Sequence, residues 1–137
     1  MKKARNKAHT GWQKIAEFCD TLTEQEDALT REMVACISDK WSLWTMSVIA
    51  EHIRPMRFSR IMERVEGISQ KSLTKTLRGL ERDGLITRKV FAEVPPRVEY
   101  AITPLGAEML DHVAPLWLWV AKGVRRFQHA RDAFDGR

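Results

Sequence analysis

The feature that most constrains the fold is a capped, amphipathic segment between Gly67 and Gly84. Three leucines recur along it at helical spacing: Leu73, Leu77 and Leu80. Ser69 occupies the position of an N-cap and Gly84 that of a C-terminal glycine, so the pattern predicts a helix over 70–83. Such a helix packs its leucines into a small core and leaves its other side exposed.

The side of this helix opposite the leucines is basic. It carries Thr74 together with Lys71, Lys75, Arg78 and Arg82. Side chains of these types bind phosphates and the edges of bases in a DNA groove. An ordinary solvated helix surface is the alternative interpretation, but the segments around the helix favour contact with DNA.

Two strand-like runs follow the helix directly. Residues 85–91 and 97–102 have β-type composition, and Val98, Tyr100 and Ile102 alternate in the second run. The pattern predicts an antiparallel hairpin whose tip contains Pro95-Pro96. A helix of this kind followed by a hairpin is the layout of a DNA-binding domain with a wing.

Composition is that of a single folded domain. The chain has 137 residues, 44% of them hydrophobic, which is enough to bury a core without metal or disulfide support. No apolar run approaches the roughly 20 residues of a membrane-spanning helix, and no hydrophobic segment follows the basic N-terminal residues. We therefore expect a cytoplasmic protein without a membrane segment.

The net charge of +5 is distributed unevenly along the chain. Residues 1–16 contain five bases and no acid, and residues 17–39 contain seven acids and one base. Residues 54–97 contain eleven bases and five acids. The positive charge therefore surrounds the predicted helix and hairpin, where it would attract a polyanion.

No residue pattern supports catalysis, a cofactor or a metal site. Cys19 and Cys36 are too few for a disulfide scaffold and lack the spacing of a zinc site, and the four histidines are scattered. No catalytic triad, carboxylate pair or glycine-rich phosphate loop is present. We expect a binding protein that is not an enzyme.

Further helices are predicted from apolar periodicity and caps. They are 12–22, 24–38, 41–52, 58–65 and 104–130, the last starting with the Thr103-Pro104 cap and kinking at Pro115. Residues 1–11 lack apolar periodicity and are predicted to be a flexible basic arm before a domain over 12–137. The predicted fold class is mainly α with a small β-hairpin wing.

Several motifs make the chain resemble a known family. They are Asp39-Lys40-Trp41-Ser42-Leu43, Arg57-Phe58-Ser59-Arg60-Ile61, the whole segment 67–86, Glu93 to Tyr100, and Thr103-Pro104-Leu105-Gly106. On these residues the chain resembles the HxlR-type winged helix-turn-helix transcriptional regulators of the MarR-like superfamily. The resemblance covers about Ala28 to Val120.

The resemblance implies a bacterial homodimer that binds a roughly palindromic operator in double-stranded DNA, most often as a repressor. Family members dimerise through helices at the chain ends, which here are 12–22 and 104–130. The residues expected in that interface are Trp12, Ile15, Leu105, Met109, Val113, Leu116, Trp117, Val120 and Val124.

Some members of the family sense reactive carbonyls or oxidants through a Cys-Pro-Val motif near the N-terminus. Alignment on Lys40-Trp41 places Ala28-Leu29-Thr30 at that position, so this chain lacks the sensing cysteine. Ser38-Asp39 also replaces a glycine pair of the family. A small-molecule effector is a further candidate partner, although the spacing of Trp41 and Trp44 favours a core role over an effector pocket.

The predicted DNA-binding residues lie in the helix-turn-helix and the wing. They are Arg57, Ser59, Ser69, Gln70, Lys71, Ser72, Thr74, Lys75, Arg78, Lys89 and Arg97. The first residues of a recognition helix usually reach base edges, which favours Gln70, Lys71 and Thr74 for readout. Arg97 could enter a minor groove, hold a phosphate, or simply pair with Glu93 or Glu99. The alternative function is a winged-helix module that binds an acidic protein.

Overall fold

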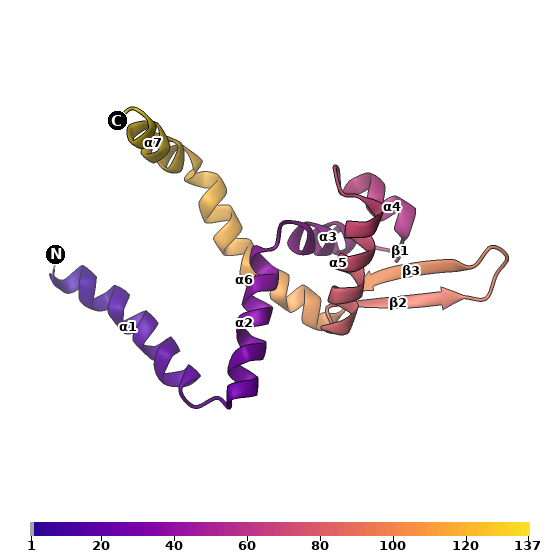
Figure 1. Ribbon diagram of the computed structural model, residues 1–137, viewed down its shortest axis with the longest axis horizontal. Coiled ribbons are helices and arrows are strands. Elements are labelled where there is room, and N and C mark those ends of the chain that lie inside the picture. Colours follow the sequence, from indigo (N-terminus) through magenta and orange to yellow (C-terminus); the bar gives the residue numbers. More distant parts are fainter. Residues whose placement is uncertain (1) are drawn as a thin grey trace. The chain divides into compact units, whose positions relative to one another are not determined.

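The computed structural model describes the backbone of residues 2–137 and the side chains of residues 11–137. Within it the chain divides into two units, residues 1–38 and 39–137. The sequence predicts a boundary near residue 11, whereas the structure divides the chain after Ser38. The first unit contains two helices and the second contains a winged helix-turn-helix with further C-terminal helices (Figure 1).

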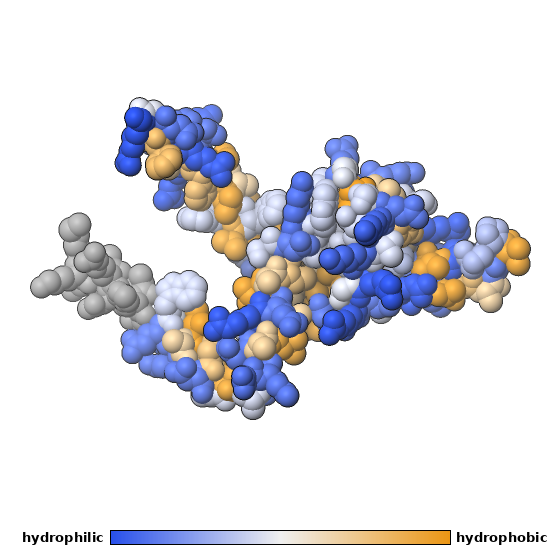
Figure 2. Space-filling view, viewed as in Figure 1, coloured by the Kyte–Doolittle hydropathy of each residue, from blue (hydrophilic) through white to orange (hydrophobic). Residues whose placement is uncertain are grey.

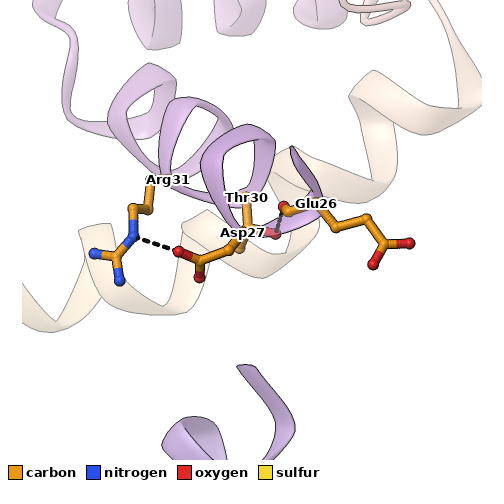
Figure 3. A network of polar contacts seen from close by, with 4 residues as sticks. All are labelled: Glu26, Asp27, Thr30 and Arg31. Carbon is orange, nitrogen blue, oxygen red and sulfur yellow. Dashed lines mark hydrogen bonds and ion pairs between the residues drawn. The ribbon is translucent and has the colours of Figure 1, made fainter. Parts of the chain in front are cut away.

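The first unit consists of α1 (Lys2–Cys19) and α2 (Glu24–Ser38). Helix α2 begins with a capping box, because Thr23 Oγ1 accepts from the N–H of Glu26 at 3.2 Å and the Glu26 carboxylate accepts from the N–H of Thr23 at 2.7 Å. On α2, Arg31 Nε donates to Asp27 at 3.0 Å, and this hydrogen bond raises the pKa of Arg31 (Figure 3). None of the side chains of residues 11–38 is buried.

The N-terminal region differs from the prediction. Helix α1 already begins at Lys2 and ends at Cys19, whereas the sequence predicts a flexible arm over 1–11 and a helix over 12–22. Met1 lies outside the described residues. Lysine, alanine and arginine have high helix propensity, so the segment forms a helix although it lacks an apolar stripe.

The second unit holds the core. Its elements are α3 (Lys40–Glu51), β1 (Met56–Arg57), α4 (Phe58–Arg64), α5 (Gln70–Arg82), β2 (Ile86–Phe91), β3 (Arg97–Ile102), α6 (Pro104–Lys122) and α7 (Val124–Asp135). Helix α3 packs against α4, α5, β3 and α6. Its buried residues include Met46 and Ile49, which confirms the prediction of a central core helix.

The strands form a three-stranded antiparallel sheet in the order β1-β3-β2. Strands β2 and β3 make the predicted hairpin, with Ile86 opposite Ile102 and Phe91 opposite Arg97. The hairpin projects away from α3, α4 and α5, with its closing loop at the far end (Figure 1). Strand β1 was not predicted, because two residues are too short to show an alternating pattern.

The C-terminal helix is interrupted at Gly123, whereas the sequence predicts one helix over 104–130 with a kink at Pro115. Helix α6 continues through Pro115 to Lys122, and α7 then runs to Asp135, beyond the predicted end at residue 130. Glycine loses more backbone entropy in a helix than other residues, which favours a helix end at Gly123. The single helix predicted over 104–130 is therefore two helices.

Candidate nucleic-acid interface

Helix α5 is fixed by a cap at each end. Ser69 Oγ accepts from the N–H of Ser72 at 3.1 Å at the N-terminus. At the C-terminus the N–H of Gly84 bonds to Glu81 O at 3.0 Å and the N–H of Leu85 bonds to Leu80 O at 2.9 Å. This is a Schellman motif, and Gly84 adopts the positive φ of 75° that it requires. Both predicted caps are confirmed.

The leucine side of α5 is fully covered. Leu73, Leu77 and Leu80 are each at most 1% exposed, and the helix packs against α3 and β2. Helix α4 precedes it through a short turn in which Gly67 has φ 84°. The helix-turn-helix predicted from the sequence is therefore present, and its geometry holds the opposite side of α5 toward solvent.

Most of the residues predicted to contact DNA lie on the exposed side of α5. Hydrophilic side chains cover this region in Figure 2. The exposed set comprises Gln70, Lys71, Thr74, Lys75, Arg78 and Arg82. Two hydroxyls in the predicted set are engaged within the helix, because Ser69 caps its N-terminus and Thr74 Oγ1 donates to Gln70 O at 2.8 Å. Ser72 is half-buried at the edge of the leucine stripe.

The basic residues of α5 and those of α4 differ in their ion pairs with the described side chains. Neither Lys71, Lys75, Arg78 nor Arg82 forms an ion pair with any side chain in residues 11–137. On α4 the situation differs, since Arg60 lies 3.1 Å from Glu63 and Arg64 lies 3.6 Å from Glu51 of α3. The charge of α5 is therefore available to a partner, while part of the charge of α4 is already neutralised.

Arg57 and Ser59 flank the start of α4, and both are exposed. Arg57 belongs to β1, where it pairs with Glu99 of β3. Lys89 of β2 pairs with the same Glu99 from the other side. The strand register thus brings Arg57 and Lys89, two residues far apart in the sequence, to one face of the sheet.

Arg97 is held within the wing. Its Nη1 lies 3.3 Å from the carboxylate of Glu93, its Nε lies 3.4 Å from that of Glu99, and its guanidinium carbon lies 4.0 Å from the centre of the Phe91 ring. Of the roles that the sequence allows for Arg97, the structure shows the ion-paired one. Contact between Arg97 and DNA remains a prediction.

A joint between α5 and α6 was not predicted. The Thr103 hydroxyl caps α6 by accepting from the N–H of Gly106 at 3.0 Å, and it donates to Gly84 O, just past α5, at 2.7 Å. The N–H of Thr103 also donates to Leu85 O at 3.1 Å. A Cβ on Gly106 would lie 2.2 Å from Leu85 O, so only glycine permits this approach. The Thr103-Pro104 pair signals the cap but not its bond to Gly84.

The predicted dimer residues fall into two groups. Val113 is buried within the second unit, and Met109 is half-buried. The others are exposed: Trp12, Ile15, Leu105, Leu116, Trp117, Val120 and Val124. Hydrophobic surface along α6 is visible in Figure 2.

The described residues show no arrangement for two other kinds of structure, a metal site and a membrane-spanning helix. No group of three histidine, cysteine or acidic side chains there has the arrangement of a metal site. No described helix is long and apolar enough to cross a membrane.

Comparison with known proteins identifies the family. The model of the HxlR-like helix-turn-helix family matches residues 36–128. The chain is 32% identical over 107 residues to the uncharacterized HTH-type transcriptional regulator YtfH of Escherichia coli, covering 78% of this chain and 83% of that protein.

Solved structures agree with this assignment. A transcriptional regulator YtfH from Salmonella typhimurium has a TM-score of 0.66 at 31% identity, over 75% of this chain and 90% of that one. A MarR-family regulator from Enterococcus faecalis has a TM-score of 0.63 at 32% identity, over 80% and 96%. The winged helix-turn-helix built around α5 therefore has close counterparts in sequence and in fold, and the chain belongs to the HxlR-like helix-turn-helix family of transcriptional regulators.

Proposed function

We propose that this chain is a sequence-specific DNA-binding repressor that acts as a homodimer. The observation that carries the proposal is the division of helix α5 into two sides. Its leucines are buried, and its four basic residues are exposed and form no ion pair with any described side chain. A cationic helix face that its own domain leaves unneutralised suits the phosphates and base edges of a major groove.

Within this interface the residues have different roles. Gln70 and Lys71 lie in the first turn of α5, where a recognition helix reaches base edges, and their side chains are exposed. Lys75 and Arg78 lie in the following turns and hold phosphates or guanine. Arg57 and Lys89, together with Ser59, extend the contact to the sheet and the start of α4.

The dimer is proposed from the terminal helices. From Leu116 onward α6 exposes consecutive apolar residues, with Leu116 57% and Trp117 65% exposed, and α7 adds Val124 and Phe127. In the first unit Trp12 and Ile15 are exposed as well. Apolar surface on this scale marks a protein interface, and a second copy is the partner that the paired half-sites of an operator require.

In the proposed complex, two α5 helices enter successive major-groove half-sites that lie about 34 Å apart, one helical turn. The two-fold axis requires a roughly palindromic operator. The effect on transcription is repression if the bound dimer covers promoter elements.

The test is binding to duplex DNA from the chain's own promoter region, compared with random duplex of equal length at moderate salt. A clear preference, with log affinity falling against log salt by about 0.9 for each phosphate neutralised, supports the proposal. Equal binding to both duplexes contradicts it. Binding to an acidic protein in place of DNA would instead support the protein-interaction alternative.

A further inference from the structure

The outward face of the wing sheet contains one acidic residue, Glu99, among several basic residues. Strand register places Glu99 opposite both Arg57 and Lys89, and Phe91 opposite Arg97. Side chains alternate along a strand, so these residues share the face opposite to that of Tyr100 and Ile86, which are buried. The carboxylate of Glu99 therefore has around it the basic residues of the sheet that are predicted to bind DNA.

Arg97 is enclosed on this face. Carboxylate oxygens of Glu93 and Glu99 lie 3.3 and 3.4 Å from two different nitrogens of its guanidinium, at ion-pair distance, and its guanidinium carbon lies 4.0 Å from the centre of the Phe91 ring. Its side chain is only 27% exposed, and its Nε is buried without a hydrogen-bond partner among the described residues, so Glu99 interacts with it through charge alone. A planar guanidinium is suited to such a site because it can serve two carboxylates and an aromatic ring together.

The loop beyond Arg97 offers no base of its own. Residues 92–96 are Ala-Glu-Val-Pro-Pro, and Val94 is fully exposed at the tip. Hydrophobic surface at the end of the hairpin is visible in Figure 2. The wing tip is therefore acidic and apolar, in contrast to the unpaired cationic face of α5.

Displacing Arg97 toward a phosphate would leave two carboxylates uncovered beside a polyanion. Repulsion from the DNA phosphates raises the free energy of carboxylates that have lost Arg97. The field of the DNA therefore favours the state in which Glu93 and Glu99 stay paired with Arg97. Lys89, whose Nζ has no carboxylate partner among the described residues and lies 5.0 Å from the Phe91 ring, is under no such restraint.

In place of the DNA contact predicted for Arg97, we propose that Glu93 and Glu99 retain Arg97 as an internal counter-charge and keep it from the DNA backbone, which limits sequence-independent affinity. This inference rests on the proposed DNA-binding function. A phosphate contact carries no sequence information, so withholding one lowers the affinity for every duplex alike and leaves the ratio of affinities between sequences to the contacts of α5.

The experiment measures the salt dependence of binding to random duplex DNA for four full-length proteins. They are the unsubstituted chain, Arg97→Gln, Glu93→Gln/Glu99→Gln, and the combination of all three substitutions. We expect Arg97→Gln alone to leave the slope of log affinity on log salt unchanged. Glu93→Gln/Glu99→Gln should steepen it by about 0.9, the value for one phosphate, and adding Arg97→Gln should remove that gain.

A matched control separates a released arginine from a general loss of negative charge. Glu66→Gln/Glu81→Gln removes two exposed acids, one just before α5 and one in its last turn, that have no ion-pair partner among the described side chains. The inference is overturned if this control steepens the slope equally, if the gain persists without Arg97, or if Arg97→Gln alone reduces the slope by about 0.9.

A measurement on the unsubstituted chain guards against misfolded variants. The Arg97 Nε–H signal should exchange slowly with solvent both in free protein and in the DNA complex, and faster exchange in the complex would contradict the inference. Lys75→Ala tests the proposed function separately, because it should reduce the slope whatever Arg97 does. Failure of the unsubstituted chain to bind DNA overturns both proposals.

Discussion

Helices α5 and α6 each carry an apolar stripe, but only α5 has its whole stripe covered within the domain. Leu73, Leu77 and Leu80 of α5 are buried, whereas α6 buries only Gly106 and Val113 and exposes its side chains from Leu116 onward. One helix leaves a charged face for a partner and the other leaves an apolar face. The two exposed faces therefore suit partners of opposite chemistry, which we propose to be DNA for α5 and a second copy of the chain for α6.

The largest expected effect comes from removing the same side chain on the two helices. Leu77→Ala deletes a buried side chain and should lower the free energy of unfolding by about 2–5 kcal/mol. Leu116→Ala deletes an exposed one and should change it by less than about 0.5 kcal/mol when the chain is monomeric. Urea unfolding at low protein concentration measures both. Equal losses would contradict the division between covered and uncovered stripes.

The uncovered stripe is tested by a charge on α6. Trp117→Glu places a carboxylate in the proposed dimer interface, where loss of an aromatic anchor alone costs at least about 2 kcal/mol, or about 30-fold in the dissociation constant. Sedimentation over a concentration series should show this weakening. Ile53→Glu is the matched control, because Ile53 is equally apolar and fully exposed but lies between α3 and β1. A monomeric unsubstituted chain at micromolar concentration would remove the paired-half-site geometry.

The sequence predicted those parts of the fold that depend on local chemistry. The caps at Ser69 and Thr103, the αL glycine at Gly84 and the leucine stripe of α5 are all set by neighbours within a few residues, and all are confirmed. The register of the hairpin likewise follows from alternation and a short loop.

The parts that escaped prediction depend on distant residues or on competing local effects. Strand β1 exists because Met56 and Arg57 pair with β3, and two residues carry no periodicity. The break at Gly123 was not predicted, although glycine loses more backbone entropy in a helix than other residues and so favours a helix end. The sequence allowed either glutamate as the partner of Arg97, and the structure uses both.

The exposed face of α5 is tested by two substitutions with different expected signatures. Gln70→Ala should relax discrimination at one base position by about 1–3 kcal/mol if this side chain reads a base edge. Lys75→Ala should weaken binding to all duplexes alike and reduce the salt slope by about 0.9 if it holds a phosphate. Selection of bound sequences from a random pool, followed by titration of the selected sites, measures both. Identical behaviour of the two variants would contradict the division of roles.

The smallest expected effect concerns Thr103, which connects the end of α5 to the start of α6. Thr103→Val keeps the shape of the side chain but removes the hydroxyl that caps α6 and donates to Gly84 O. Loss of an N-cap costs about 0.5–2 kcal/mol, so the free energy of unfolding should fall by about 1 kcal/mol in Thr103→Val. Thr103→Ser keeps the hydroxyl and should keep most of that stability. Hydrogen exchange at the N–H of Gly106 locates the change.

The same pair of variants can separate a cap from a joint. The hydrogen bond from Thr103 to Gly84 O could fix the direction of α6 relative to α5. In that case the Thr103→Val protein should also bind operators whose half-sites are one base pair closer together or farther apart than in the preferred operator. Its affinity for a single half-site should stay unchanged, because the exposed face of α5 is untouched. Equal weakening on every spacing would mean that Thr103 stabilises the domain without setting the angle between the helix that meets DNA and the helix proposed to meet the second copy.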